Sequence, residues 1–183
     1  MIAALIAITL LLSTGCVALA GAHLRRVLRS ASPDIRALAI SLKRLPLPSR
    51  AEELARRARP ESWERSLAQS LLEAPDEKSR VAAANDALAD MDNTLSAGAS
   101  WPGAAVRVCA RASLLLAIIA FLTQRSTSGI LPILAILAIG GAGTLACISI
   151  GRRSVREARE RREAIDALIA TLLGSAARSE RAS

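Results

Sequence analysis

The chain has 183 residues, of which 52% are hydrophobic, 22% charged and only 2% aromatic, and its formal net charge is +8. This alanine- and leucine-rich composition favours helices over sheet. So few aromatic rings leave little to stack on bases, and the positive charge therefore does not indicate a nucleic-acid partner.

The hydrophobic residues gather in three blocks, at 1–22, 104–124 and 130–150, and nearly all charged residues lie between and after them. A helix of roughly 20 apolar residues is long enough to cross a bilayer. The sequence therefore predicts an all-α integral membrane protein with three transmembrane helices, whose first partner is the lipid bilayer.

Residues 1–22 form the first predicted span. The run from Leu12 to Cys16 looks somewhat like the cleavage box of a lipoprotein, because a small residue precedes Cys16, but no basic residue precedes the apolar run. Apolar residues continue to Ala22 and are followed by Arg25 and Arg26, which favours an uncleaved anchor. Cleavage near residue 20 stays an alternative.

Residues 23–103 are predicted to form a small helical cytosolic region divided by prolines. Pro46 and Pro48 are expected to end one helix, and Ser49 with Glu52 has the spacing of a capping box that opens the next. About 80 residues in short helices bury a small core, so we expect an extension of the membrane bundle and not an enzyme domain. An apolar stripe at helical spacing is expected to pack against neighbours in the same chain: Val81, Ala84, Leu88, Met91 and Leu95.

The second span, at 104–124, carries Arg107 and Arg111 near its start, and their side chains must snorkel. Residues 125–129 are predicted to form an outer hairpin that leads into the third span at 130–150. Residues 151–183 contain no proline, and the segment up to Leu173 contains a single glycine, Gly151. The third span is therefore expected to continue as one long cytosolic helix that ends in a frayed tail.

Arginines follow the first span, begin the second and follow the third, whereas the hairpin carries Arg125 alone. Because positive residues stay on the cytosolic side, the N-terminus is predicted to lie outside a multi-pass protein of the bacterial inner membrane.

The sequence offers no combination of residues typical of an enzyme. His23 is the single histidine, and a metal site or a histidine-assisted nucleophile would need partners that the chain lacks. The three cysteines lie in or beside spans at spacings that suit neither zinc nor disulfides, and they are predicted to be reduced packing residues. We therefore expect no catalysis, no metal and no cofactor.

Small residues repeat every fourth position in the third span and predict a helix-packing seam, because they let helix backbones approach closely. The seam is either a contact within the chain or a contact between subunits, and the sequence favours neither. Its members are Ala138, Gly140, Ala142, Gly143, Ala146 and Cys147.

The order of a span, cytosolic helices, a hairpin of two spans and a long cytosolic helix resembles the MotA/TolQ/ExbB family of proton-channel subunits. Residues 140–149, GGAGTLACIS, look like the third-span motif of that family, and 85–93 followed by 107–121 is similar to the helix that leads into its second span. The resemblance covers roughly the last hundred residues. It implies a homo-oligomer of about five subunits and a one-span partner protein.

This chain departs from the family at the channel. Ala120 and Gly140 occupy the positions where the family has channel-facing threonines. The position of the family's third-span glutamate corresponds approximately to Ala135. Thr144 and Ala120 are the candidate pore-facing residues. Because no span holds an acidic residue, the chain alone is not expected to conduct protons.

The resemblance implies a divergent TolQ/ExbB-like structural subunit of an energy-transfer or transport complex. Two alternatives remain, a membrane scaffold of a secretion or pilus assembly platform and an assembly factor without a transport role.

Overall fold

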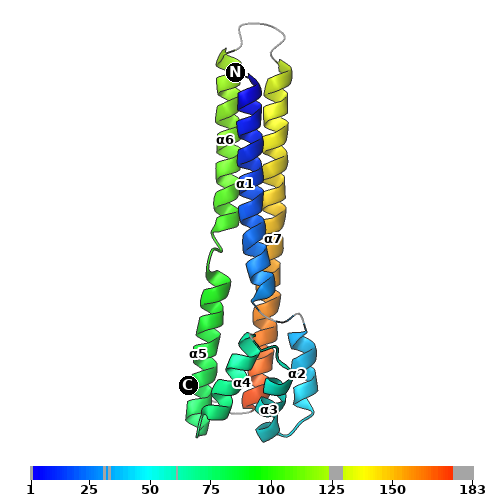
Figure 1. Cartoon of the computed structure of the whole chain (residues 1–183), viewed down its shortest axis with the longest axis vertical. Helices are drawn as coiled ribbons and strands as arrows, with labels where there is room; N and C mark the ends of the chain where they lie inside the picture. The colour runs from blue at the N-terminus through cyan, green and yellow to red at the C-terminus, as the bar shows by residue number, and fades with distance from the viewer. Residues whose placement is uncertain (1, 31, 33, 61, 124–129, 175–183) are drawn as a thin grey trace. The chain divides into compact units, whose positions relative to one another are not determined.

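A computed structural model describes residues 2–30, 32, 34–60, 62–123 and 130–174 of the chain. These residues form α-helices and no strand (Figure 1), which confirms the all-α prediction for this part of the chain. The outer hairpin predicted at 125–129 and the frayed tail beyond Gly174 lie outside the described residues. The helices are α1 (Ile2–Arg29), α2 (Ile35–Lys43), α3 (Leu47–Arg57), α4 (Trp63–Glu73), α5 (Glu77–Ser96), α6 (Trp101–Thr123) and α7 (Ile130–Leu173).

The chain divides into two compact units. The first, which we call the three-helix unit, comprises Met1–Arg25 and Gly98–Val155. The second, the bundle unit, comprises Arg26–Ala97 and Arg156–Ser183. The units divide after Arg25, Ala97 and Val155.

The three-helix unit contains most of α1, all of α6 and the first part of α7, which pack through two small clusters. One cluster joins Leu5 of α1 to Ala117 and Ala120 of α6 and Ile136 of α7. The other holds all three cysteines together with Ala20 and Ala105. Because most of these side chains are small, the helices touch through little more than their backbones and Cβ atoms.

Helix α6 begins at Trp101, three residues before the predicted span. Gly98, at φ +78°, lies between the end of α5 and the start of α6. A positive φ is readily adopted only by glycine, so this residue fixes the place where the helical path is interrupted.

The bundle unit has a larger core of leucine, isoleucine and alanine side chains, to which α2, α3, α4, α5 and the end of α7 all contribute. The stripe of α5 packs here within its own chain, as predicted, with Val81, Ala84, Met91 and Leu95 buried. Helices α2 to α5 and the end of α7 form a compact unit with a core of its own, and the expectation that 23–103 extends a membrane bundle stays a prediction. Residues of α7 complete the core from a distant part of the sequence: Ala164, Ile165, Leu168, Ile169 and Leu172.

Local signals set the starts of α4 and α5. The Ser62 side chain accepts a hydrogen bond from the Arg65 N–H, and the Asp76 carboxylate accepts one from the Ser79 N–H at 3.1 Å. The capping box predicted at Ser49 is wrong. Helix α3 begins earlier, at Leu47, with a proline in its first turn where no N–H is needed, and the Ser49 hydroxyl donates to the Pro46 carbonyl.

Helix α7 is continuous over 44 residues, which confirms that the third apolar block runs on as one helix. It ends at Gly174, where φ is +65°, a common way to close a helix. The Arg50 guanidinium donates a hydrogen bond to the Thr171 carbonyl in the last turn of α7, and its Nε donates to the Leu45 carbonyl at 2.8 Å. The bond to Thr171 satisfies an acceptor that the end of α7 leaves open.

Candidate functional site

The interior of the three-helix unit is lined mainly by small and hydroxyl-bearing side chains, and Leu5 and Ile136 are its buried large apolar members. On α1, Thr9, Ser13 and Cys16 are buried, at 1%, 6% and 6% exposure. Their spacing of four and then three residues places them on one face of the helix. Ser113 of α6, which is also buried, lies in the same interior.

Most of these hydroxyl groups donate to their own helix. Thr9 donates to the Leu5 carbonyl at 2.8 Å, Ser113 to the Cys109 carbonyl at 2.7 Å, and Thr144 to the Gly140 carbonyl at 2.8 Å. Each bond runs four residues back along the same helix, so the hydroxyl hydrogen is satisfied without help from another helix.

Weaker contacts around Cys109 join the three helices. Its thiol lies 3.5 Å from the Ser13 hydroxyl of α1 and 3.6 Å from the Gly140 carbonyl of α7. Hydrogen bonds to sulfur are weak. The Cys109 thiol of α6 therefore contacts both α1 and α7, but these contacts contribute little stabilisation.

Two glycines of α7 allow this approach. A Cβ atom added to Gly140 would overlap the Ser113 side chain. One added to Gly143 would lie 2.8 Å from the Ser13 Cβ and 3.1 Å from the Cys109 Sγ. Because real Cβ atoms do not approach other atoms so closely, only glycine fits at these positions without movement of α1 or α6.

The structure divides the predicted seam between two faces of α7. Gly140, Gly143 and Cys147 are buried against α1 and α6 of the same chain. Ala138 and Ala142 are exposed, whereas Ala146 is half-buried. The buried members are thus contacts within the chain, and the exposed alanines remain the part of the seam that a second subunit could cover.

The two candidate pore-facing residues lie in different surroundings. Ala120 is fully buried against Leu5 and Ile136, so its methyl group faces the interior of the unit. Thr144 is half-buried, and its hydroxyl is occupied by the Gly140 carbonyl. Neither residue offers a titratable group.

Cys109 is a free, buried packing residue, as predicted for the cysteines, whereas Thr9 and Ser13 were not predicted to be interior residues. A signal was available on α1, where Thr9, Ser13, Cys16 and Ala20 recur at helical spacing inside an otherwise leucine- and isoleucine-rich run. In a helix that packs in lipid, small and hydroxyl residues mark the helix-facing side and large apolar residues the lipid-facing side.

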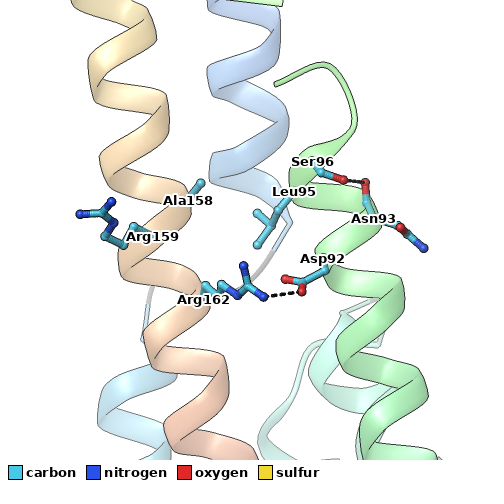
Figure 2. A pocket seen from close by; sticks show the side chains of 7 residues that line it. All are labelled: Asp92, Asn93, Leu95, Ser96, Ala158, Arg159 and Arg162. Carbon is cyan, nitrogen blue, oxygen red and sulfur yellow. Dashed lines mark hydrogen bonds and ion pairs between the residues drawn. The ribbon is translucent and has the colours of Figure 1, made fainter. Parts of the chain in front are cut away.

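A second candidate site, in the bundle unit, is a groove of about 380 Å³ between α5 and α7. Figure 2 shows Asp92 and Leu95 pointing into it from α5 and Arg162 reaching across from α7, whereas Arg159 points away. Arg162 and Asp92 form an ion pair at 2.7 Å, with both side chains well exposed. Exposed ion pairs contribute little free energy, so this groove is a charged surface feature and not a built active site.

All three cysteines, Cys16, Cys109 and Cys147, are free and buried. Within the described ranges, no group of three or more His, Cys, Asp or Glu side chains could hold a metal ion. The interior of the three-helix unit can pack helices, but its hydroxyls offer no acid or base.

Fold and site together define an all-helical protein with three helices that are long and apolar enough to cross a membrane. The second apolar stretch lies within 77–123 and corresponds to α6. Comparisons with known proteins add no relative, because no family model, no curated protein and no solved structure matches this chain.

Proposed function

We propose that this chain is a three-span protein of the bacterial inner membrane that acts as a structural subunit of a larger complex. The observation that carries the proposal is the surface of the three-helix unit, which exposes large apolar side chains where a soluble protein would expose polar ones. Nearly all exposed large apolar side chains of the described residues belong to this unit, the exceptions being Ile40, Leu47 and Leu72. A soluble protein rarely exposes so large an apolar surface, whereas lipid tails would cover it at no cost.

The proposed orientation places the N-terminus and 124–129 outside, and 23–103 and 151–183 in the cytosol. Arginines support it: Arg25 lies near the end of the α1 span, Arg107 near the start of α6 and Arg152 after the α7 span. Retention of residues 1–20 is supported by Leu5, Thr9 and Ser13, which are part of the interior packing.

Cysteine labelling in intact cells tests the orientation. In a background with the three native cysteines replaced by alanine, Ser126→Cys should react with a membrane-impermeant maleimide, and Ala82→Cys, on an exposed face of α5, should react only after lysis. The reverse pattern would overturn the orientation. A protein that carbonate washing strips from the membrane would overturn the membrane proposal itself.

The proposed role is that of a divergent TolQ/ExbB-like subunit, supported by the motif resemblance at 140–149 and by the order of the helices. The geometry adds that two of the motif's glycines, Gly140 and Gly143, contact α6 and α1 directly. This makes the motif a packing element of the single chain. A one-span partner protein that carries a membrane aspartate belongs to this proposal.

The same proposal holds that the chain alone conducts no protons. A conducting path needs polar or titratable groups in a wetted cavity, and the Thr144 hydroxyl is already bonded to the Gly140 carbonyl. Liposomes that contain the purified protein should lose an imposed pH gradient no faster than empty liposomes. A leak that Thr144→Val abolishes would contradict this and restore a channel function.

Self-association through the exposed small residues of α7 is the remaining part of the proposal. Gly143→Leu is a poor test of it, because Gly143 contacts Ser13 and Cys109 within the chain. Ala142→Leu is sharper, since Ala142 is exposed, and leucine there should block close approach of a second α7. Leu145→Ala, on an exposed position one turn away, is the matched control. Mass measurement in native lipid that finds wild type monomeric would remove the homo-oligomer.

A further inference from the structure

A groove of about 410 Å³ lies within the three-helix unit between the start of α6 and the middle of α7. Its walls are apolar, and the one charged side chain that lines it is Arg152. The volume is within the range of about 300–1,000 Å³ that is typical of small-molecule sites. The principal apolar residues are Pro102, Gly103, Val106, Ile148, Gly151 and Val155.

Two glycines shape the groove. At Gly151, an added Cβ would lie 3.1 Å from the Pro102 Cβ, so α6 and α7 come close together there. At Gly103, by contrast, an added Cβ would meet no atom within 4 Å. The missing side chain of Gly103 therefore leaves open space on the groove wall, and a larger residue at 103 would fill it without displacing a helix.

The three-helix unit is basic and holds no acidic residue. Residues 1–25 and 98–155 contain no Asp and no Glu, yet they include Arg25, Arg107, Arg111, Arg152 and Arg153. Gly103 and Arg107 are four residues apart on α6, so Arg107 extends from the same side of the helix one turn further along. Under the proposed topology Arg152, which follows the third span, lies near the level of the cytosolic headgroups, where phosphates are the abundant anions, whereas Arg107 and Arg111 lie deeper and snorkel towards them.

The chemistry of the walls selects among anionic ligands. Apart from Arg152, the lining side chains offer no strong hydrogen-bond donor or acceptor. A polar solute or a peptide would lose its water there without compensation. An acyl chain loses nothing. Trp101, which precedes the groove residue Pro102, is 41% exposed and is the residue type that settles at headgroup depth.

We propose that this groove binds an anionic phospholipid of the cytosolic leaflet, one acyl chain lying along the apolar walls and the phosphate paired with Arg152. The inference rests on the proposed membrane function. A lipid held in this way would fill the space beside Gly103 and neutralise the basic end of the unit.

Tryptophan quenching tests the proposal, because the chain has two tryptophans and one of them neighbours the groove. Trp63 lies in the bundle unit, where its indole donates to the Ala87 carbonyl, and Trp63→Phe leaves Trp101 as the single reporter. The full-length variant is placed in phosphatidylcholine vesicles that contain dibrominated phosphatidylglycerol or, at the same mole fraction, dibrominated phosphatidylcholine. Bromine on an acyl chain in the groove quenches Trp101.

We expect the quenching of Trp101 to show that the groove binds phosphatidylglycerol roughly fivefold more tightly than phosphatidylcholine, because one basic residue contributes a preference of this size at a membrane surface. Arg152→Gln should abolish the preference, and Gly103→Leu should reduce quenching by the anionic lipid. Two matched controls should leave the preference unchanged. Arg25→Gln removes the same charge away from the groove, and Gly141→Leu adds the same side chain at an exposed glycine with no atom within 4 Å.

Each other outcome has a distinct meaning. Equal loss of preference in Arg25→Gln and Arg152→Gln would show general attraction to the surface and overturn the groove. Equal quenching by both lipids in the parent would also overturn it while leaving the membrane proposal intact. No quenching by either lipid would mean that Trp101 does not contact the bilayer, and the proposed function would fail instead.

Discussion

The closest helix contact in the three-helix unit predicts a sharp response to a single methyl group at residue 140. A Cβ on Gly140 would overlap the Ser113 side chain, so Gly140→Ala must push α6 and α7 apart. Overpacking of this kind costs about 1–3 kcal/mol. Gly141→Ala is the matched control, because a Cβ at residue 141 meets no atom within 4 Å and alanine favours a helix.

The buried cysteines provide the assay, since all three are shielded in the folded unit and react with a maleimide dye when it opens. If labelling follows the unfolding equilibrium, Gly140→Ala should accelerate it roughly 5- to 150-fold, the ratio for about 1–3 kcal/mol. Ser113→Gly should restore much of the loss in the double variant, because it removes the atoms that the new methyl group strikes. Equal labelling rates for Gly140→Ala and Gly141→Ala would refute the packing geometry.

Three further predictions concern the bundle unit, each measured by thermal unfolding of the full chain. Hydrogen bonds from the Ser79 side chain and, to a smaller extent, from its backbone N–H lower the pKa of Asp76, so the stabilising effect of the ionised Asp76 should be present above the usual aspartate pKa and disappear as the pH falls through the lowered one; an Asp76→Ala variant with unchanged pH dependence would contradict this. Glu64 is 1% exposed and accepts the Ser32 N–H at 2.7 Å, so Glu64→Leu should cost about 1–3 kcal/mol and Glu64→Gln clearly less; equal losses would exclude the bond as the cause. Arg162→Gln should cost under about 1 kcal/mol because the Asp92 pair is exposed, and a larger loss would mean that the pair is more than a surface contact.

The sequence predicts helices well where one face must leave water. Val81, Ala84, Met91 and Leu95 repeat at helical spacing, and all four are buried. The same rule identifies Ile165, Leu168 and Ile169 near the end of α7. Periodicity shows that a face is buried but not what covers it, and for that reason the core shared by α7 with α2 to α5 was not predictable from the sequence.

The seam shows the limit more clearly. Small residues stand on two neighbouring faces of α7, one with Ala138 and Ala142 and one with Gly140 and Gly143. Spacing alone cannot rank them, because each is compatible with a close helix contact. The deciding information is on other helices, where Ser13 of α1 and Ser113 of α6 meet the glycines. Complementary small residues on three separate segments become visible only once the helices are packed.

Different interactions stabilise the interior of each unit, and this difference bears on the membrane proposal. The bundle unit buries Leu42, Leu54, Leu67 and Leu168 almost completely, so removal of apolar surface from water stabilises it. The three-helix unit exposes most of its large side chains, apart from Leu5 and Ile136, and mainly buries serine, threonine, cysteine, alanine and glycine, which gain little from leaving water. Without lipid around them, its helices would have only close contact to hold them together. A unit built in this way is stable where its surroundings are already apolar. In lipid, the helix contacts at Gly140 and Gly143 compete only with contacts to acyl chains, whereas in water they would compete with the much stronger tendency of the exposed apolar side chains to cluster.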